Sequence, residues 1–537
     1  MALRVQDALP SKCLSVMGRI RSYLRPEREL NFGGCSIARE SGESFFMEEQ
    51  QMTVVKTGAP PTLAQQWKSY DWKQAEKEVK RLQVRIAKAV RERQFNKVKA
   101  LQWLLTSSFS AKMLAVKRVT SNKGSRTPGI DGVIWRSPTA RMEGALALRR
   151  HGYRAKPLRR ITIPKKNGGR RPLGIPTIYD RAMQALYLLA LEPVAETTAD
   201  WNSYGFRPFR ACRDAIGQCF CDLGKRNSAE WILEGDIKAC FDGISHEWLR
   251  ENVLMDSKIL SQWLSCGYIQ GGELFPTRAG TPQGGIISPT LANIALDGME
   301  AAIKAVSRRK DKANFVRYAD DFIVTGSCKE FLVETIIPVV EEFLRPRGLV
   351  LSEKKTFITN IEDGFDFLSQ NVRKFKGKMQ ITPSKDAVKR ITQKLRQIFI
   401  EHLGRKTEEL IVRLNRVIRG WANYHRYIQS WKAFSNIDYV IYCTTQRWMR
   451  RRHPNKSVGW TLRKYFHRSK RYSAVFHARP EGCYGEQNTI DLIRMAEIIR
   501  VRYIKIKGKS NPYDPAYKRY FAMRSKACNY KPTMSTT

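Results

Sequence analysis

The sequence predicts an α+β fold, in which helices and short strands form an enzyme-like body and a strongly basic helical region follows. Two β-rich runs on either side of an adjacent Asp pair predict an antiparallel hairpin over residues 315–325. Apolar residues spaced by three and four predict an amphipathic helix over residues 72–105. Residues 371–537 contain 38 Lys and Arg against 10 Asp and Glu, which gives them +28 of the chain's net charge of +45.

The composition limits the class of protein. Hydrophobic residues make up 42% and aromatic residues 10% of the 537 positions, enough to bury folded cores, so a disordered basic protein is excluded. The net charge of +45 indicates a polyanionic partner. The longest apolar stretch, residues 183–190, is far shorter than the roughly 18 to 20 residues of a membrane helix, so we expect no membrane partner.

The N-terminal residues 1–47 mix Ser, Gly and Arg with scattered apolar residues and show no sustained period. We therefore expect a poorly structured leader there. Its acidic residues argue against an organellar transit peptide, and Met47 or Met52 is an alternative start of the protein. Clusters of Gly and Pro predict loops at residues 124–132, 167–176 and 271–289.

Three carboxylates form the candidate catalytic centre. Asp320 and Asp321 are expected at the tip of the predicted hairpin, and Asp236 ends a buried strand predicted at residues 231–236. An Asp-Asp turn alone would explain the hairpin, but adjacent carboxylates repel one another unless a cation neutralises them. Three of them on one sheet suit two Mg²⁺ ions that catalyse phosphoryl or nucleotidyl transfer. Asp242 lies just past the strand, where a structural role is the better interpretation.

Several ordered motifs carry a resemblance to a known family. Residues 318–321 (Tyr-Ala-Asp-Asp), Asp236 with Phe241 five residues on, and residues 281–289 (Thr-Pro-Gln-Gly-Gly-Ile-Ile-Ser-Pro) look like reverse transcriptase motifs. Over about residues 48–525 the chain more specifically resembles the reverse transcriptase/maturases encoded by group II introns. The segments that carry this closer resemblance are residues 171–176, 180–181, 203–208 and 418–425.

The resemblance implies a right-hand polymerase fold: fingers and a palm with an antiparallel sheet, followed by an α-helical thumb/maturase domain. A His-Asn-His nuclease domain, which follows in many relatives, is expected to be absent. The implied regions are 1–47, a leader; 48–150, an N-terminal extension and the start of the fingers; 151–373, fingers and palm; 374–471, thumb/maturase; and 472–537, a basic DNA-binding-like tail.

The resemblance also assigns roles to single residues. The implied catalytic metal ligands are Asp236, Asp320 and Asp321, with the backbone carbonyl of Ile237 as a further ligand of two Mg²⁺ ions. The implied nucleotide-binding residues are Lys165 and Arg171 on the phosphates, Phe241 against the ribose 2′ position and Gln283 against the incoming nucleotide. The alternatives are a core aromatic for Phe241 and a solvated basic hairpin for residues 163–172. Gly284 and Gly285 would let the backbone approach a substrate closely.

Cations interleaved with aromatic residues in the last third suit RNA, because they neutralise phosphates and stack on unpaired bases. Charged, solvated helices are the alternative interpretation, although they do not explain the net charge of +28 in residues 371–537. The candidate RNA-binding residues are Arg413, Arg416 and Arg419, which share one helix face, and Arg450, Arg451 and Arg452.

The expected function is an RNA-directed DNA polymerase that also acts as a maturase in intron splicing and mobility. Its expected partners are group II intron RNA, target DNA and deoxynucleoside triphosphates, in the bacterial cytoplasm or in a plastid or mitochondrion. Residues 367–370 read Phe-Leu-Ser-Gln where the family usually has Phe-Leu-Gly-aromatic. A splicing-only maturase with a degenerate polymerase site is therefore the alternative. An RNA-directed RNA polymerase is disfavoured by residues 318–321 and by Phe241.

Overall fold

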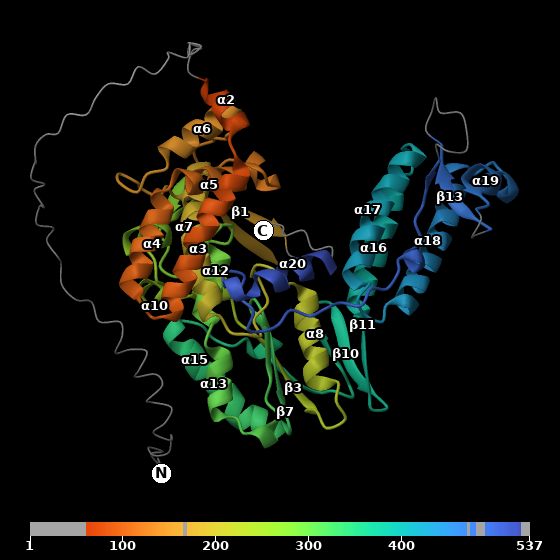
Figure 1. Cartoon of the computed structure of the whole chain (residues 1–537). Helices are drawn as coiled ribbons and strands as arrows, with labels where there is room; N and C mark the ends of the chain where they lie inside the picture. The colour runs from red at the N-terminus through yellow and green to blue at the C-terminus, as the bar shows by residue number, and fades with distance from the viewer. Residues whose placement is uncertain (1–60, 165–168, 470–472, 480–488, 528–537) are drawn as a thin grey trace, which may run out of the picture.

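The computed structural model describes residues 61–164, 169–469, 473–479 and 489–527 (Figure 1). Helices and two small sheets form a body, and a group of helices stands to one side of it. The predicted α+β class is confirmed. The expected leader lies outside the described residues. No helix in the described part of the chain is long and apolar enough to cross a lipid bilayer.

The N-terminal helices pack around one buried helix, α7 (Ile178–Thr198), which lies in the hydrophobic core over nearly its whole length. The expected single helix over residues 72–105 is wrong in its continuity, because the chain turns at Arg93 (φ +56°) and starts a second helix. The predicted apolar face is confirmed, since Ala75 and Ile86 are buried. The N-terminal helices are α2 (Leu63–Ser69), α3 (Trp72–Arg91), α4 (Phe95–Ser107), α5 (Phe109–Thr120) and α6 (Pro138–Ala147).

The first sheet, here called the finger sheet, has the strand order β2-β1-β4-β5. Its antiparallel hairpin places Ile163 opposite Arg171, and the outer ends of both strands are exposed. The loop of this hairpin, residues 165–168, lies outside the described residues. The strands are β1 (Leu158–Pro164), β2 (Arg170–Ile175), β4 (Tyr268–Gln270) and β5 (Glu273–Phe275).

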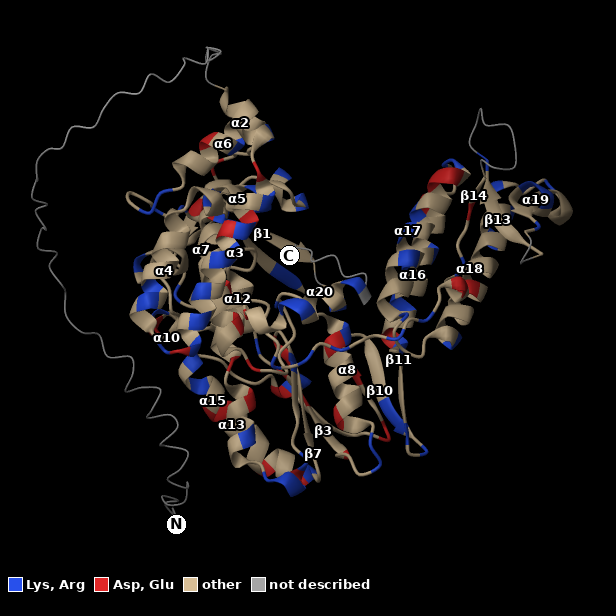
Figure 2. Ribbon diagram, viewed as in Figure 1, with Lys and Arg blue, Asp and Glu red and all other residues tan. Residues whose placement is uncertain are grey.

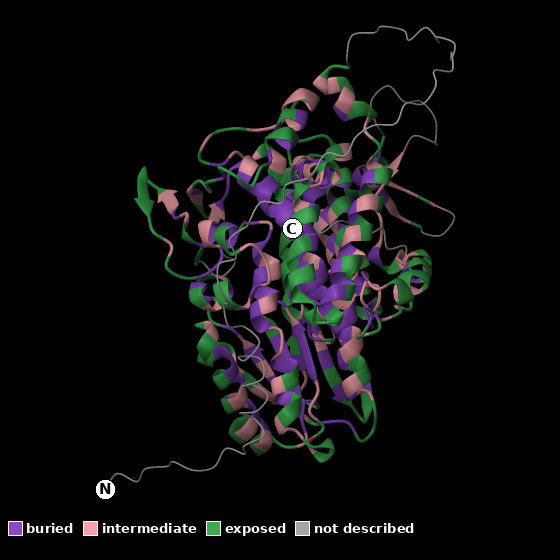
Figure 3. Cartoon of the chain, turned by 60° about the vertical axis from the view of Figure 1, so that its left-hand side comes forward, coloured by how far each residue is buried: buried purple, intermediate pink, exposed green. Residues whose placement is uncertain are grey.

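The second sheet, here called the palm sheet, has the antiparallel order β6-β7-β3-β8 and is covered on both faces. Successive side chains of a strand point to opposite faces, so Leu233 of β3 joins the core under α13 and α15, whereas Ile232 joins the core beside α8. Figure 3 shows these strands mostly in the colour of buried residues. The elements named are β3 (Trp231–Asp236), β6 (Phe315–Tyr318), β7 (Asp321–Gly326), β8 (Phe357–Asn360), α8 (Cys212–Leu223), α13 (Met299–Val306) and α15 (Ile337–Leu344).

Shorter helices lie between these strands in the sequence. They are α9 (Cys240–Gly243), α10 (His246–Asn252), α11 (Ser257–Ser265), α12 (Ser288–Leu296) and α14 (Lys329–Phe331). The short 3-10 turn η5 (Glu353–Lys355) precedes β8 and contacts β3. The end of the palm sheet that carries Asp236 and Asp321, here called its open end, therefore has a segment from a distant part of the sequence beside it.

The helices beside the body, here called the thumb helices, have their own hydrophobic core, which includes Leu414, Ile418 and Trp448. A three-stranded antiparallel sheet, in the order β11-β10-β9, leads from the palm sheet into them. A second small sheet, β12-β13-β14, lies on their outer side. The elements are β9 (Phe365–Phe367), β10 (Gln370–Phe375), β11 (Lys378–Pro383), α16 (Lys385–Glu401), α17 (Thr407–His425), α18 (Trp431–Arg452), α19 (Val458–Tyr465), β12 (Phe466–His467), β13 (Val475–Ala478) and β14 (Ile490–Asp491).

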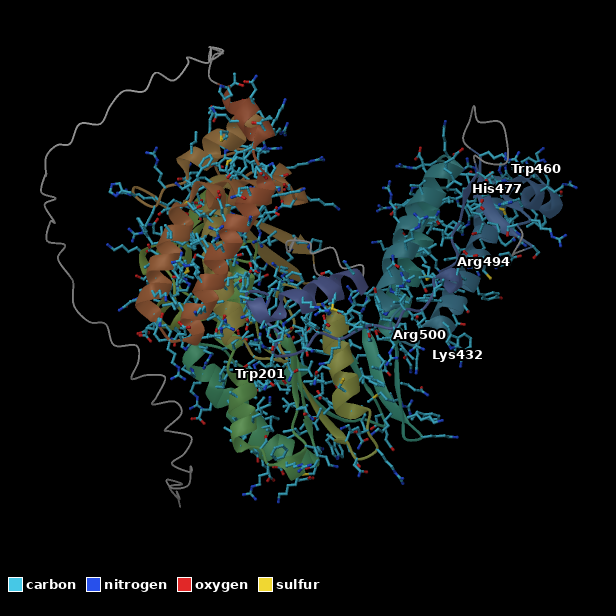
Figure 4. All side chains as sticks on the ribbon, in the orientation of Figure 1. Trp201, Lys432, Trp460, His477, Arg494 and Arg500 are labelled. Carbon is cyan, nitrogen blue, oxygen red and sulfur yellow. The ribbon has the colours of Figure 1, made fainter. Side chains whose placement is uncertain are left out.

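The last described segment, residues 498–527, returns from the thumb helices to the body and ends in α20 (Lys518–Ala527) (Figure 1). The Ile506 backbone N–H donates to Asp214 Oδ1 at 2.7 Å, and Lys80 Nζ of α3 donates to the Pro512 carbonyl at 2.9 Å. Trp201, labelled in Figure 4, lies under Lys509, whose Nζ is 4.2 Å from the ring centre. Much of the expected DNA-binding-like tail is thus packed against the palm and the N-terminal helices.

Candidate catalytic site

Asp320 and Asp321 lie at the tip of the β6–β7 hairpin, as the sequence predicts. Tyr318 pairs with Asp321, which leaves Ala319 and Asp320 to form the turn. Ala319 has a φ of +60°, the left-handed conformation that such a tight turn requires. Phe322 and the rest of β7 are buried, so the exposed Asp321 is held on a rigid support.

A buried ion pair fixes this hairpin from below. Arg317 has no exposed surface, and its Nη2 donates to Asp297 Oδ1 at 2.5 Å. Its Nη1 donates to Asn293 Oδ1 at 3.1 Å and to the Ala319 carbonyl at 3.3 Å, which ties the arginine directly to the turn. Burial raises the pKa of Asp297, and the Arg317 charge opposes that shift. This pair was not predictable from the sequence, since Arg317 has the pattern of an ordinary strand residue before the Asp-Asp motif.

Asp236 ends β3 and lies directly opposite Asp321 of β7 in the sheet register, so these two carboxylates share one end of the palm sheet. Ile237 follows, with its side chain buried and its backbone bridged to Leu351. Asp242 lies on α9, five residues beyond Ile237, and is exposed.

Lys355 is a functional candidate that sequence reasoning missed. Its Nζ lies 2.9 Å from Asp236 Oδ2, although the lysine side chain is 65% exposed. The hydrogen bond to Asp236 raises the pKa of Lys355. The pair of basic residues Lys354 and Lys355 just before β8 was a possible signal. Only the register of β8 beside β3 shows that Lys355 is the one near Asp236.

The carboxylates have the electrostatic character of a cation site. Burial raises the pKa of Asp321 to about 6, and the negative charges of Asp320 and Asp236 contribute to the shift. Burial also raises the pKa of Asp320, with Asp236 contributing and Arg171 opposing. Like charges held together raise each other's pKa, and a divalent cation removes this repulsion. Within the described residues the carboxylates do not form a preassembled metal cluster, and Lys355 contacts one of them.

Two predicted nucleotide-binding residues meet beside the carboxylates. Arg171 Nε of β2 donates to Gln283 Oε1 at 2.5 Å, and Gln283 Nε2 donates to Asp242 Oδ2 at 3.0 Å. Arg171, Gln283 and Asp242 therefore form a polar chain from the finger sheet to α9. The charge of Arg171 opposes the rise in the pKa of Asp320, so one end of this chain lies within electrostatic reach of the carboxylates. Lys165, the other predicted phosphate ligand, lies outside the described residues.

Phe241 lies on α9 and is half-buried, packed against the hydrophobic core. The loop before α12 reaches it, since the Thr281 N–H donates to the Phe241 carbonyl at 2.6 Å. Gly284 has a φ of +129°, and a Cβ there would lie 2.5 Å from the Gly174 carbonyl of β2. The glycine therefore allows close packing of the loop on the finger sheet, and its approach to a substrate stays a prediction.

The unusual Phe-Leu-Ser-Gln segment is the turn between β9 and β10. Leu368 and Ser369 both have left-handed backbones, with φ of +51° and +62°. Gln370 is buried, and the Tyr424 hydroxyl of α17 donates to the Leu368 carbonyl at 2.8 Å. A glycine would adopt the Ser369 conformation without strain. The turn is nevertheless complete, and the exposed Ser369 hydroxyl accepts from Arg390 Nη2 of α16 at 3.3 Å.

The first three predicted RNA-binding arginines lie as expected. Arg413, Arg416 and Arg419 are exposed along α17, whereas Leu414 and Ile418 of the same helix are fully buried. Figure 2 shows Lys and Arg distributed along α16, α17 and α19. A row of cations is thus presented away from the thumb core.

The second arginine cluster divides into two kinds. Arg450 and Arg451 are exposed at the end of α18, but Arg452 is half-buried. Arg452 Nη1 donates to the carbonyls of Leu403 and Arg405, at 3.1 and 2.6 Å. Arg452 therefore ties α18 to the loop after α16, while its two neighbours remain available to a ligand.

Exposed aromatic residues on α18 were not singled out from the sequence. Trp431, Tyr439 and Tyr442 are 71%, 69% and 47% exposed. Their spacing of eight and three places them on one side of the helix, together with the exposed Arg450. Lys432, labelled in Figure 4, stands at the start of the same helix. Large aromatic side chains in water beside cations are typical of surfaces that stack on unpaired bases.

Comparison with known proteins decides the family. Residues 163–372 match the model of reverse transcriptase (RNA-dependent DNA polymerase), residues 67–148 the N-terminal domain of reverse transcriptase, and residues 388–466 the group II intron maturase-specific domain. Protein YkfC of Escherichia coli is 32% identical over 48% of this chain and 79% of its own length. Group II intron-encoded protein LtrA of Lactococcus lactis is 28% identical over 61% of this chain and 70% of its own.

The chain belongs to the group II intron reverse transcriptase/maturase family. It is an RNA-directed DNA polymerase and maturase by that membership. Solved telomerase structures align with this reverse transcriptase/maturase more distantly. The telomerases of Candida albicans and Candida tropicalis give TM-scores of 0.34 and 0.36 at 12% and 13% identity, over 58% and 56% of this chain and 61% and 58% of theirs.

Proposed function

We propose that this reverse transcriptase/maturase copies intron RNA into DNA at Asp236, Asp320 and Asp321 and holds that RNA along its thumb helices. The observation that carries the proposal is the pairing of Asp236 with Asp321 at the open end of the palm sheet. The polar chain of Arg171 and Gln283 starts beside it. Carboxylates for metal ions and a cation for phosphate are the two requirements of nucleotidyl transfer.

The donor set fits Mg²⁺, since it consists of carboxylate oxygens and one backbone carbonyl. Asp236, Asp320, Asp321 and the Ile237 carbonyl would hold two ions. The raised pKa of Asp321 supports this fit, because desolvation and the neighbouring charges of Asp320 and Asp236 both disfavour its charged form unless a cation is bound. When bound, such ions activate the primer 3′-hydroxyl and stabilise the charge on the leaving phosphate.

The other residues of the site bind and orient the nucleotide. Arg171, on an exposed strand end of the finger sheet, donates to phosphate oxygens, and Lys165 in the adjoining loop adds a second cation. Gln283 orients the Arg171 guanidinium and lies against the nucleotide. Phe241 limits space at the ribose 2′ position and so favours deoxyribonucleotides. In the absence of the metal ions, Lys355 neutralises Asp236.

The maturase function is assigned to the thumb helices. Arg413, Arg416 and Arg419 supply charge along α17, and Arg450 and Arg451 supply it at the end of α18. Trp431, Tyr439 and Tyr442 offer rings on which unpaired bases stack. RNA with single-stranded loops therefore suits this surface better than a uniform duplex.

The domain assignment follows the same scheme. Residues 48–150 form the N-terminal extension and the start of the fingers, 151–373 the fingers and palm, and 374–471 the thumb/maturase domain. Some cations of the basic region 472–537 hold it on the palm. Its other cations contact target DNA. The chain acts where its intron is transcribed, in the bacterial cytoplasm or an organelle.

No specific observation favours a splicing-only maturase. That alternative rests on residues 367–370 and on the expected absence of the nuclease domain, yet the β9–β10 turn keeps its contact with Tyr424. The pairing of Asp236 with Asp321 supports the polymerase site. We therefore retain the polymerase as the main activity of residues 163–372.

Primer extension tests the polymerase assignment. Purified full-length protein with a DNA primer on an RNA template should extend the primer when Mg²⁺ and deoxynucleoside triphosphates are present. Asp321→Asn should abolish extension, and Asp363→Asn, a matched change of an exposed carboxylate between β8 and β9, should leave it unchanged. Equal extension by wild type and Asp321→Asn would refute the assignment.

A further inference from the structure

Phe206 occupies an unusual position between the palm and the site. Its side chain is 37% exposed, whereas Ser203, Tyr204 and Arg207 around it are buried. Its backbone has a φ of +57°, a conformation that bulky side chains rarely adopt. Residues held in such a conformation are concentrated at functional sites, because the surrounding structure must impose it.

The surrounding contacts impose this conformation from both sides. Gly205 packs so closely on the catalytic hairpin that a Cβ there would lie 2.3 Å from the Ala319 nitrogen. Asn293 Nδ2 donates to the Gly205 carbonyl at 2.8 Å. On the other side, Arg207 Nε donates to Glu196 Oε1 at 2.8 Å in a fully buried ion pair. Phe206 is therefore held between these contacts, and its neighbour Gly205 packs on the turn that carries Asp320.

The fixed ring of Phe206 contacts Phe241. Their ring centres are 6.2 Å apart and the planes meet at 81°, an edge-to-face contact. Phe241 follows Ala239, which has a left-handed backbone (φ +47°), on a helix of one turn. Such a short helix restrains its side chains weakly, so the contact with Phe206 is a large part of what orients the Phe241 ring on its open side.

We propose that Phe206 is a positioning residue that holds the Phe241 ring against the nucleotide sugar and thereby sets the discrimination between deoxyribonucleoside and ribonucleoside triphosphates. This inference rests on the proposed polymerase function. Phe206 acts through Phe241 and makes no contact with the catalytic carboxylates of its own. Without its ring, Phe241 can tilt away and admit a 2′-hydroxyl.

The same loop supplies a matched control. Phe209 also has a left-handed backbone (φ +61°), but its ring packs against Phe521 of α20, with centres 4.9 Å apart. Loss of the Phe209 ring therefore perturbs the loop without removing a neighbour of Phe241. If sugar discrimination falls in the Phe206 variants and not in Phe209→Ala, the effect is due to the contact with Phe241 and not to a general loosening of the loop.

The test compares single-nucleotide insertion of a deoxyribonucleotide and the matching ribonucleotide as the ratio of their kcat/KM values. Phe206→Ala and Phe206→Gly should lower this ratio about ten-fold, mainly through a lower KM for the ribonucleotide. Phe206→Gly also removes the backbone strain, so a loss of discrimination that both variants share is due to the missing ring. Phe206→Tyr should restore the wild-type ratio, and Phe209→Ala should keep it.

The double variant Phe206→Ala, Phe241→Ala should discriminate no less than Phe241→Ala alone, because Phe206 acts through Phe241. Wild-type ratios in both Phe206→Ala and Phe206→Gly would overturn the inference. Additive losses in the double variant, or a wild-type ratio in Phe241→Ala, would overturn it as well. Failure of the wild-type protein to insert any deoxyribonucleotide would instead refute the polymerase function itself. Circular dichroism of each variant verifies that it is folded.

Discussion

Arg524 and Asp214 form an ion pair at 2.8 Å that is almost completely closed to solvent, although 310 residues separate them in the sequence. The same Asp214 oxygen accepts the Ile506 N–H. Arg210 Nη2 donates to the nearby Gly508 carbonyl at 2.8 Å. The segment after the thumb is therefore part of the palm structure, and its cations serve the fold as well as any ligand.

Breaking this pair should destabilise the protein. Arg524→Ala leaves a buried carboxylate without its partner, so we expect a loss of about 3 to 5 kcal/mol in the free energy of unfolding. Denaturant or thermal unfolding of the full-length chain measures it. Arg519→Ala, which removes an exposed arginine of the same helix, should change stability by less than about 0.5 kcal/mol. Equal stability of the two variants would show that the segment is not anchored at Asp214.

The raised pKa of Asp321 predicts a pH-dependent stability. Its folded pKa of about 6 lies above the usual value for Asp, so the folded state binds more protons than the unfolded state between these values. Without Mg²⁺, stability should therefore fall as the pH rises from about 4 to 6. Asp321→Asn should remove this part of the dependence. Thermal unfolding without divalent ions at a series of pH values measures it.

Mg²⁺ should reverse this trend, because it binds the deprotonated carboxylates. The rise in Tm on adding Mg²⁺ should be larger at pH 8 than at pH 5, and it should be small in Asp321→Asn at both. Ca²⁺ serves as a control that binds carboxylates with less demanding geometry. A rise in Tm that is equal at pH 5 and pH 8 would contradict a metal site built from these groups.

Ser369 should be a position where glycine stabilises the protein. Its φ of +62° costs a non-glycine residue about 1 kcal/mol, so Ser369→Gly should gain about that amount, less the lost contact with Arg390. Ser435→Gly, at an exposed position in the second turn of α18, should instead lose about 0.5 kcal/mol. Chemical denaturation compares the two variants. A loss of stability in Ser369→Gly would mean that the serine side chain outweighs the strain.

The thumb arginines and aromatics should affect RNA binding in different ways. Replacing Arg413, Arg416 and Arg419 by Gln should weaken binding and reduce the dependence of log K on log salt by about 2 to 3 units, if each neutralises one phosphate. Trp431→Ala should weaken binding to RNA with unpaired loops and leave the salt dependence unchanged. Filter binding at several salt concentrations separates them. An unchanged slope in the arginine variant would place the RNA elsewhere.

The placement of Asp236, Asp320 and Asp321 at strand ends was predictable from sequence because their positions follow from local rules. A period of two defines the strands, and a short polar break between two apolar runs places Asp320 and Asp321 at a turn. The register that sets Asp236 opposite Asp321 was not encoded locally. It followed from the family resemblance, which supplied the long-range pairing.

The supporting residues were not predictable for the same reason. Arg317, Lys355 and Phe206 acquire their roles only when distant segments pack. Residues 203–208 were noted as a motif, but the motif does not reveal that Phe206 contacts Phe241. The helix over residues 72–105 breaks at Arg93, while the apolar period continues past the break. The packing of Gly284 on β2 was not predictable, because the sequence does not reveal that β2 lies against it.

The central claim is that one chain carries a polymerase at Asp236, Asp320 and Asp321 and a maturase on its thumb helices. The most direct measurement is the rate of intron splicing by Asp320→Asn, Asp321→Asn, taken beside primer extension in the same preparation. For the double Asp variant we predict a wild-type splicing rate and no primer extension. For the variant that lacks Arg413, Arg416 and Arg419 we predict lost splicing and wild-type primer extension on a template other than the intron. Loss of both activities together in each variant would contradict two separate sites.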